Sequence, residues 1–325
     1  MSSQRGPRAA LPTTVGVIGL GAMGAPMTRN LLAAAGSVSP SPTPAPTPPT
    51  PLTTILVNHR SRDRAAELLE AGAVWAGTPR ELAAADVIVF MLPDLPQVDE
   101  VLDGADGVLA GIDSPTVLVI GSTSSAQGVR DLDSRVSAAT GGLARVIDAP
   151  VSGGEDGARA ATLSIMVGGD KQPVEAAWST LETFGTPVHL GPLGSGEIAK
   201  YCNQIIVAST IMALGEAAVL ADRSGLDVGA MFDLLEGGYA GSRVLATRKQ
   251  RIVDEDYSPS GPAKFMVKDL TYATIEAERT GTTAPQLHSL LDQFTRLTEE
   301  GYGDQDISVT RAYIDSLTPP RTVVD

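Results

Sequence analysis

The sequence predicts an α/β domain with a doubly wound, mostly parallel sheet, followed by an all-α domain. The length of 325 residues corresponds to about two domains of roughly 150 residues each. Short apolar, β-branched runs alternate with helical patterns over residues 13–193, whereas only helical patterns follow over residues 194–317. We expect a cleft for a small substrate between the two domains, and flexible tails at residues 1–12 and 318–325.

The first domain is predicted from apolar strands that alternate with helices. Near-continuous apolar runs such as Asp86–Met91 indicate strands buried on both faces, as in a parallel sheet between two layers of helices. We predict strands at Thr14–Ile18, Thr54–Val57, Asp86–Met91, Thr116–Ile120, Ala144–Asp148 and Thr162–Val167. We predict helices at Ala25–Ala35, Arg62–Glu70, Val129–Ala139 and Pro173–Phe184, and a further helix that starts at Val98–Leu102.

A proline-rich insertion, residues 37–53, interrupts this alternation. It carries seven prolines between Pro40 and Pro51, interspersed with Ser, Thr and Ala. Proline removes backbone donors and holds the chain extended, so we predict a disordered, polyproline-like surface loop. A recognition motif for a proline-binding domain is the alternative interpretation.

The second domain is predicted from helical patterns alone. They cover Ile198–Ala221, Val228–Leu235, Ser242–Ile252, Ala263–Arg279, Gln286–Glu300 and Ile307–Leu317. The most apolar stretch, Ile205–Ala221, contains Ser209, Thr210 and Glu216, and we interpret it as a buried helix and not a membrane span. Residues 1–12 contain no apolar signal segment, and we therefore expect a cytoplasmic protein.

The composition argues against several kinds of partner and of binding site. Lys and Arg total 24 against 38 Asp and Glu, and the net charge of −14 argues against nucleic acid or an anionic membrane surface. The single cysteine, Cys202, excludes an intramolecular disulfide framework. The three histidines show no metal-ligand spacing, so we expect no metal site.

A glycine-rich turn joins the first strand to the first helix. Gly19, Gly21 and Gly24 fit the pattern G-x-G-x-x-G, which provides a tight turn, a close backbone approach for a pyrophosphate and close packing of helix on strand. Strand, turn and helix together predict a dinucleotide-binding Rossmann domain over residues 13–193. The predicted cofactor-binding residues here are Gly19, Leu20, Gly21, Ala22, Met23 and Gly24. A glycine turn without a ligand is the alternative.

The end of the second strand bears on the choice of cofactor. NAD-binding domains normally carry an acidic residue there for the ribose hydroxyls, but this chain has His59, Arg60 and Ser61. Arg60 can pair with a 2′-phosphate and Ser61 can donate to it, which favours NADPH over NAD. The alternative is that Arg60 only solvates a loop and that both cofactors are used.

Two further groups of polar residues are candidates for substrate chemistry. Lys200, Asn203 and Gln204 share one face of a predicted, otherwise apolar helix, where a lysine of lowered pKa can donate a proton to an alkoxide. By spacing alone, however, a surface lysine explains the pattern better. The Ser152 side chain and the backbone amides of Gly153 and Gly154 can form a nest for a carboxylate, or an ordinary turn.

Four ordered sequence blocks resemble the β-hydroxyacid dehydrogenases, a family that includes 3-hydroxyisobutyrate dehydrogenase and tartronate semialdehyde reductase. They are GLGAMGAPMTRNL (19–31), MLPDLPQVDEVL (91–102), DAPVSGG (148–154) and GPLGSGEIAKYCNQIIVA (191–208). The KDL of residues 268–270 also agrees. The resemblance covers residues 14–317 apart from the insertion. It implies a Rossmann domain, an all-α domain entered through a long helix, and hydride transfer at a small hydroxy acid or semialdehyde.

The resemblance also implies residue roles. It makes Lys200 the catalytic acid/base, with Asn203 and Gln204 as substrate-binding residues one turn further on. Ser122, Ser152, Gly153 and Gly154 correspond to residues that hold the substrate and its carboxylate. Met91, Leu92 and Pro93 correspond to the loop beside the cofactor ribose, and Lys268 to a lysine that closes over substrate and nicotinamide. The all-α half resembles a dimerisation unit, and we expect a homodimer or homotetramer.

Some positions depart from the family pattern. Ile120-Gly121 replaces the usual Asp-Met, and residues 156–161 differ from the common loop, so the substrate is less constrained than the reaction. Gln204, in place of Asn, resembles the tartronate semialdehyde branch, as does the segment GGYAGSRVL (237–245). We therefore predict an NADPH-dependent reductase of a small semialdehyde, with tartronate semialdehyde (2-hydroxy-3-oxopropionate) as the first choice. The alternatives are a 3-hydroxyisobutyrate dehydrogenase, a glyoxylate or succinic semialdehyde reductase, and a non-catalytic NADP-binding module.

Overall fold

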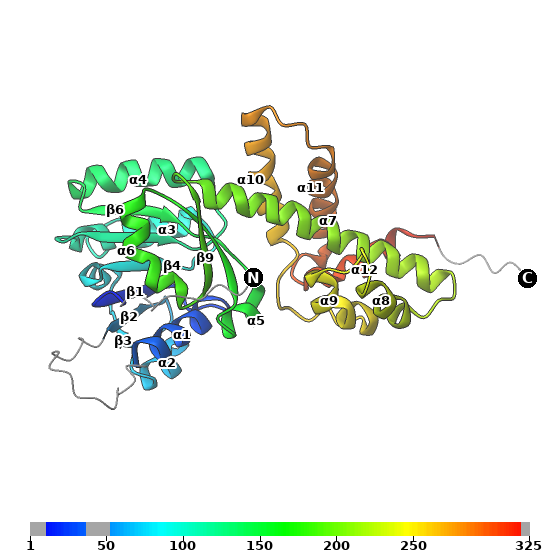
Figure 1. Ribbon diagram of the computed structural model, residues 1–325, viewed down its shortest axis with the longest axis horizontal. Coiled ribbons are helices and arrows are strands. Elements are labelled where there is room, and N and C mark those ends of the chain that lie inside the picture. The colour runs from blue at the N-terminus through cyan, green and yellow to red at the C-terminus, as the bar shows by residue number, and fades with distance from the viewer. Residues whose placement is uncertain (1–10, 37–52, 320–325) are drawn as a thin grey trace, which may run out of the picture. The chain divides into compact units, whose positions relative to one another are not determined.

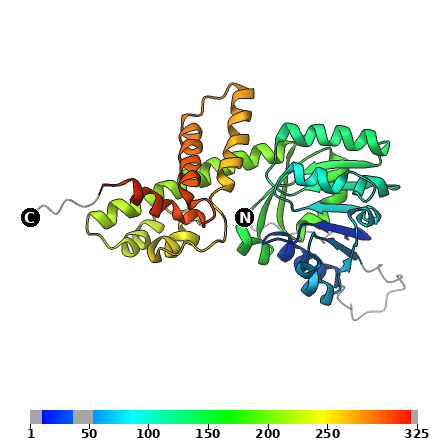
Figure 2. The same cartoon turned by 180° about the vertical axis from the view of Figure 1, so that it is seen from behind.

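The computed structural model describes residues 11–36 and 53–319, in two compact units (Figures 1 and 2). The division by contacts falls between Lys200 and Tyr201, and each unit is described by itself. Most of the predicted flexible tails, residues 1–10 and 320–325, and nearly all of the predicted proline-rich insertion, residues 37–52, lie outside the described residues.

The N-terminal unit, residues 1–200, is built on a single sheet. Its strands are β1 (Thr14–Ile18), β2 (Thr54–Asn58), β3 (Val74–Trp75), β4 (Val87–Phe90), β5 (Thr116–Ile120), β6 (Ala144–Asp148), β7 (Val151–Ser152), β8 (Leu163–Gly168) and β9 (Gly185–Gly191). They lie in the order β3-β2-β1-β4-β5-β6-β8-β7, with β9 paired to β8. The first six in this order are parallel, and β8 runs antiparallel to β6. The chain order reverses direction at β1, the position at which doubly wound sheets bind ligands.

Helices cover both faces of this sheet (Figure 1). They are α1 (Gly24–Gly36), α2 (Ala66–Glu70), α3 (Leu95–Leu102), α4 (Ala126–Thr140), α5 (Gly154–Arg159) and α6 (Lys171–Glu182), with short 3₁₀ turns η1 (Arg62–Ala65), η2 (Pro79–Ala84) and η3 (Val108–Gly111). The predicted doubly wound, mostly parallel α/β fold is confirmed.

Because side chains alternate between the two faces along each strand, the sheet has a separate hydrophobic core on each face. In β4, Val87 and Val89 pack with side chains of α1, α2 and α6 on one face, whereas Ile88 and Phe90 pack with α3 and α4 on the other. Side chains of successive strand residues point to opposite faces, so a strand buried on both sides needs an unbroken apolar run. This requirement explains why VIVF and TVLVI lie at the centre of the sheet.

The C-terminal unit, residues 201–325, is helical over its described residues. The long helix α7 (Ser195–Arg223) begins in the first unit and continues here, followed by α8 (Val228–Glu236), α9 (Arg243–Asp254), α10 (Phe265–Thr280), α11 (Pro285–Leu297), the π turn η4 (Thr298–Tyr302), the 3₁₀ turn η5 (Ile307–Val309) and α12 (Thr310–Leu317). The predicted all-α domain is confirmed for these residues.

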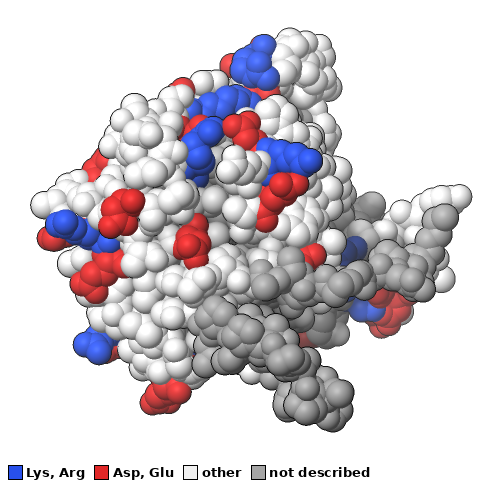
Figure 3. All heavy atoms as spheres, turned by 60° about the vertical axis from the view of Figure 1, so that its left-hand side comes forward, with Lys and Arg blue, Asp and Glu red and all other residues white. Residues whose placement is uncertain are grey.

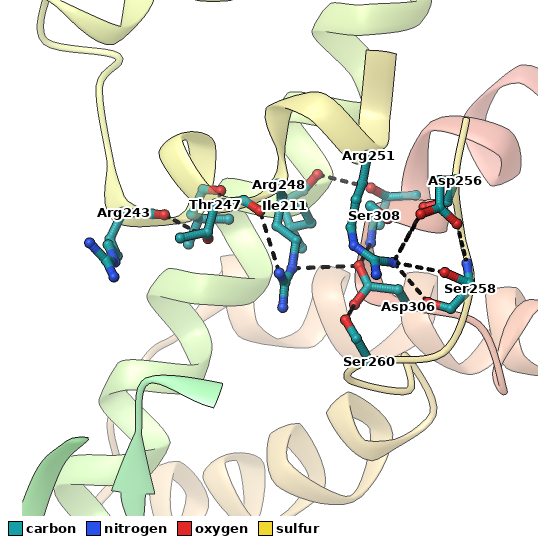
Figure 4. Close-up of polar contacts among 12 residues, drawn as sticks. Ile211, Arg243, Thr247, Arg248, Arg251, Asp256, Ser258, Ser260, Asp306 and Ser308 are labelled. Atoms are coloured by element: carbon teal, nitrogen blue, oxygen red, sulfur yellow. Dashed lines mark hydrogen bonds and ion pairs between the residues drawn. The ribbon is translucent and has the colours of Figure 1, made fainter. Parts of the chain in front are cut away.

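A buried carboxylate, Asp306, organises one part of this unit (Figure 4). It accepts hydrogen bonds from the Ser260 hydroxyl at 2.6 Å and the Ser308 backbone N–H at 3.0 Å, and it forms an ion pair with Arg248 of α9 at 3.5 Å. The aspartate therefore connects α9 to the segment before α12.

Several element predictions differ from the structure. The predicted helix Arg62–Glu70 is a 3₁₀ turn followed by the short α2, and the tight turn brings the guanidinium of Arg62 to 5.8 Å from the ring centroid of Trp75. The predicted helix Gln286–Glu300 ends at Leu297, because Gly301 has φ of 92° and the last turn widens into a π turn. The short strands β3 and β7, the edge strand β9 and helix α5 were not predicted.

The surface carries charges of both signs, and one long helix is strongly apolar. On the face in Figure 3, acidic and basic side chains are interspersed, with no extended patch of one sign. Among the described residues, α7 is the one helix long and apolar enough to cross a membrane by length and composition, and half of its most apolar window is buried inside the protein. Buried core helices pass the same test. The described residues contain no cluster of three side chains able to hold a metal ion.

Candidate active site

The carboxyl ends of β1, β4 and β5 bring several predicted site residues together. The Met91 backbone N–H donates to Ile18 at 2.9 Å, and that of Gly121 donates to Phe90 at 3.0 Å. The Ser122 hydroxyl donates to the carbonyl of Leu92. The glycine turn, the Met91–Pro93 loop and Ser122 are therefore neighbours at one edge of the sheet, where doubly wound folds bind ligands.

The three fingerprint glycines face different surroundings. A Cβ at Gly19, whose φ is +93°, would overlap the carbonyl oxygen of Met91, and a Cβ at Gly24 would overlap that of Gly19. A Cβ at Gly21, by contrast, would meet nothing within 4 Å. The first and third glycines are needed for backbone packing, whereas the second leaves open space above the backbone. This arrangement fits the pyrophosphate of a dinucleotide beside the start of α1.

The loop after β2 is shaped by a histidine. Nδ1 of His59 accepts the backbone N–H of Ser61 at 3.0 Å and thereby closes a small turn. Arg60 and Ser61 are both exposed on this turn. A guanidinium and a hydroxyl on an exposed turn at this strand end suit a phosphate on the adenosine ribose.

The predicted carboxylate-binding turn is a junction between a strand and a helix. Ser152 ends β7, and α5 begins at Gly154. Gly153 has φ of 140° and Gly154 has φ of 63°, and residues other than glycine rarely adopt such positive φ values. The Asn30 side chain of α1 donates to Ala158 of α5 at 2.7 Å, so this junction is fastened to the helix that follows the glycine turn.

Two buried carboxylates that were not predicted as site residues hold the start of α7. Asp148, the last residue of β6, accepts the backbone N–H of Gly194 at 2.8 Å and that of Glu197 at 2.8 Å. Glu197 in turn accepts the backbone N–H of Ser124 at 2.9 Å. Both side chains are 0% exposed, and Lys200, one turn further along α7, is 8% exposed. Burial raises the pKa of Asp148, while the hydrogen bonds from backbone N–H groups oppose that rise.

A second polar network lies within the C-terminal unit. The Asn203 side-chain amide donates to the oxygen of Gln204 at 2.8 Å, and the Gln204 amide donates to Asp269 at 2.6 Å. Lys268 lies 3.5 Å from the same carboxylate, which is 5% exposed. Two predicted site residues, Gln204 and Lys268, thus share one partner, Asp269, which was not itself predicted, and Asn203 is connected to it through Gln204. The position of Asp269 inside the KDL block and between apolar helix residues was the available signal.

The comparisons with known proteins agree with this geometry. The family model described as the NAD binding domain of 6-phosphogluconate dehydrogenase matches residues 52–194. The model described as NAD-binding of NADP-dependent 3-hydroxyisobutyrate dehydrogenase matches residues 194–313. The two matches meet at the start of α7 and together cover most of the described chain.

Individual relatives extend over nearly the whole chain. The 2-hydroxy-3-oxopropionate reductase of Escherichia coli K12 is 36% identical over 297 residues, which cover 90% of this chain and 94% of that protein. An NAD-dependent L-serine dehydrogenase of Pseudomonas aeruginosa is 32% identical over 312 residues, covering 93% and 97%. The crystal structure of a 3-hydroxyisobutyrate dehydrogenase from Salmonella typhimurium superposes with a TM-score of 0.80 at 26% identity, covering 92% and 99%. The chain therefore belongs to the β-hydroxyacid dehydrogenases, a family of NAD(P)-dependent oxidoreductases.

Proposed function

We propose that this protein is an NADPH-dependent reductase that converts 2-hydroxy-3-oxopropionate to glycerate, with Lys200 as the proton donor. The observation that carries the proposal is a nearly buried lysine on a helix whose first turn is bonded to the sheet edge that holds the glycine turn and Ser122. Lysine is seldom so buried unless it is paired or used in chemistry.

NADPH would be held by backbone groups of residues 19–24 and by the Met91–Pro93 loop. Gly21 supports this assignment, because the space above it is open while the flanking glycines are tightly packed. Arg60 and Ser61 would bind the 2′-phosphate, since this turn carries no carboxylate at the position of His59. Lys268 would contact the nicotinamide end. Bound NADPH supplies the hydride that reduces the substrate carbonyl.

In the proposed mechanism, Lys200 acts on the carbonyl oxygen. Its ammonium donates a hydrogen bond to that oxygen and transfers a proton as the negative charge of the alkoxide develops. In the reverse direction the neutral amine removes the proton of the hydroxyl group. The low exposure of Lys200, 8%, leaves little water around this side chain, and an interaction with the developing charge is stronger where water is scarce.

The substrate carboxylate would rest on the Ser122 hydroxyl and on the Ser152–Gly154 junction. Asn203 and Gln204 would contact the hydroxyl and aldehyde oxygens. The choice of 2-hydroxy-3-oxopropionate is supported by Gln204 and by the 36% identity to a relative of that name. Because other relatives are named for 3-hydroxyisobutyrate and L-serine, the corresponding semialdehydes are the second candidates.

The test is a matrix of initial rates. NADPH and NADH oxidation are measured with 2-hydroxy-3-oxopropionate, methylmalonate semialdehyde, succinic semialdehyde and glyoxylate, and NAD⁺ and NADP⁺ reduction with L-serine. We expect the highest kcat/KM for NADPH with 2-hydroxy-3-oxopropionate. A higher kcat/KM for another substrate would overturn the substrate assignment, and a preference for NADH would overturn the role of Arg60.

A further inference from the structure

A fully buried carboxylate spans the first turn of α7. Asp148 lies at the end of β6, and its two oxygens accept the backbone N–H groups of Gly194 and Glu197, each at 2.8 Å. The first N–H groups of a helix have no partner within the helix, so a carboxylate that accepts two of them fixes where the helix starts. Here the carboxylate also belongs to the sheet, and the helix is therefore attached to β6.

Glycines make this attachment close. A Cβ at Gly196 would lie 2.8 Å from an Asp148 oxygen, and a Cβ at Gly168 of β8 would overlap the other oxygen. With any other residue at these positions, α7 would have to move away from the strands or Asp148 would have to leave its place. The first turn of the helix thus rests directly against the sheet.

A second buried carboxylate attaches the same turn to the loop after β5. Glu197 accepts the backbone N–H of Ser124 at 2.9 Å, two residues after Ser122. The Arg130 guanidinium of α4 donates to the Leu193 carbonyl at 3.0 Å, just before α7 begins. The start of α7 is therefore held from β6, from the loop after β5 and from α4.

Lys200 follows Glu197 by one helical turn. Three residues at 1.5 Å each separate them along the axis, over a hydrogen-bonded and stiff segment. A movement of the first turn is therefore passed on to the Lys200 backbone with little loss. A displacement of about 1 Å of a group in the reacting geometry can cost about 100-fold in rate.

We propose that Asp148 and Glu197 are positioning residues that hold the first turn of α7, and through it Lys200, at the carboxyl edge of the sheet. This inference rests on the proposed role of Lys200. Neither carboxylate needs to touch the substrate or the cofactor. Each acts through backbone N–H groups, Asp148 on α7 itself and Glu197 on the loop that carries Ser122.

The test is a double-mutant cycle between Asp148→Asn and Lys200→Ala, with the best substrate of the rate matrix. Asn presents an NH₂ group to one of the two backbone N–H groups, and we expect kcat to fall about 100-fold with the NADPH dissociation constant changed less than twofold. In Lys200→Ala, ethylamine is added as a free proton donor. Because this amine is not attached to α7, Asp148→Asn should change the rescued rate less than threefold.

Controls separate positioning from loss of stability. Asp133→Asn removes another carboxylate of this unit that accepts a backbone N–H, from Val146 at 2.8 Å, and should leave kcat within threefold even where its melting temperature falls equally. Glu197→Gln keeps an oxygen for the Ser124 N–H and should retain most of the turnover. Glu197→Leu has no such oxygen and should lose most of the turnover. This pair carries the test if Asp148→Asn does not fold.

Three results would overturn the inference. The first is that Asp148→Asn lowers the rate by the same factor in wild type and in the amine-rescued Lys200→Ala variant. The second is that kcat is unchanged in both Asp148→Asn and Glu197→Leu. Wild-type turnover in Lys200→Ala would refute the proposed function itself, and with it this inference. The first two results leave the role of Lys200 intact.

Discussion

The two units hold their polar site residues in different ways. In the N-terminal unit the glycine turn, the Met91 loop and the start of α7 are fixed by backbone groups, or by carboxylates bonded to backbone N–H groups. In the C-terminal unit Asn203, Gln204, Lys268 and Asp269 are joined side chain to side chain.

This difference indicates which site groups are fixed by the fold and which can change with single substitutions. Contacts between backbone groups, as in the glycine turn, depend on no single side chain, and at the start of α7 they depend on the two carboxylates alone. A side-chain network, by contrast, is rebuilt when any of its members is replaced. We infer that the N-terminal unit carries the common chemistry of cofactor and proton transfer, and that the Gln204 network adjusts which substrate is accepted.

The glycine turn offers the sharpest contrast between two similar substitutions. Gly24→Ala should lower the free energy of unfolding by about 3 kcal/mol, because its Cβ would overlap the backbone oxygen of Gly19, which cannot move aside. Gly21→Ala should change it by less than about 0.5 kcal/mol, yet weaken NADPH binding at least tenfold by filling the open space. Urea unfolding and NADPH fluorescence titration measure the two quantities. Equal loss of stability in both variants would contradict this view of the turn.

The exposed turn after β2 tests whether cofactor choice also belongs to the N-terminal unit. Arg60→Gln should raise KM for NADPH about 30-fold, since a charge-assisted phosphate contact contributes about 2 kcal/mol, and leave KM for NADH unchanged. Arg64→Gln is the matched control, because it removes the same charge from the exposed η1 turn. A rise of equal size in both variants would indicate general charge attraction and no specific phosphate contact.

The side-chain network should respond in substrate binding and not in chemistry. Gln204→Asn shortens the side chain by one methylene and breaks the 2.6 Å bond to Asp269. We expect KM for 2-hydroxy-3-oxopropionate to rise about tenfold, equivalent to about 1.4 kcal/mol, with kcat within threefold. Gln250→Asn, which shortens a glutamine bonded to Asp254 at 2.8 Å on α9, should have no effect on either constant. A fall of kcat at constant KM would assign Gln204 to the chemical step.

The smallest effect concerns Tyr257, whose hydroxyl finds no hydrogen-bond partner among the described residues. Burial is the main cause that raises its pKa from 10.0 to about 12. The charges of Glu255 and Asp315 raise the pKa further, and the charge of Arg311 lowers it. Between these values the folded state keeps a proton that the unfolded state loses, so stability falls as the pH rises from 10 towards 12.

The Tyr257→Phe variant removes this dependence. Its stability relative to wild type should increase between pH 9 and pH 11, by less than about 1 kcal/mol because the residue is only partly buried. Urea unfolding at the two pH values measures the change. Tyr239→Phe alters an exposed tyrosine and should show no change. A difference between Tyr257→Phe and wild type that does not depend on pH would refute the assigned titration.

The sequence was sufficient for elements with a strong local pattern. Apolar strands such as β4 and β5 and the glycine turn after β1 are specified by neighbouring residues alone. Strand β9 was missed because it alternates only weakly and leaves Val188 and Leu190 exposed. The two-residue strands β3 and β7 exist because a neighbouring strand pairs with them, which no local pattern can reveal.

The same reasoning explains which site residues escaped prediction. The backbone partners of Asp148 lie 46 and 49 residues further along the chain, and Gln204 and Asp269 are separated by 65 residues. No spacing rule connects such pairs. A signal did exist, since each of these acidic residues follows or interrupts an apolar run and must therefore find a polar partner when buried.

The role of Lys200 is tested most directly by the Lys200→Ala variant, measured for turnover and for cofactor binding in the same preparation. If Lys200 is the proton donor, kcat falls by about 1,000-fold, within the range for loss of a general acid, while the NADPH dissociation constant stays within twofold of wild type. Turnover within tenfold of wild type would contradict the assignment of the acid. An equal loss of NADPH binding would show that Lys200 serves the cofactor and not the reacting carbonyl.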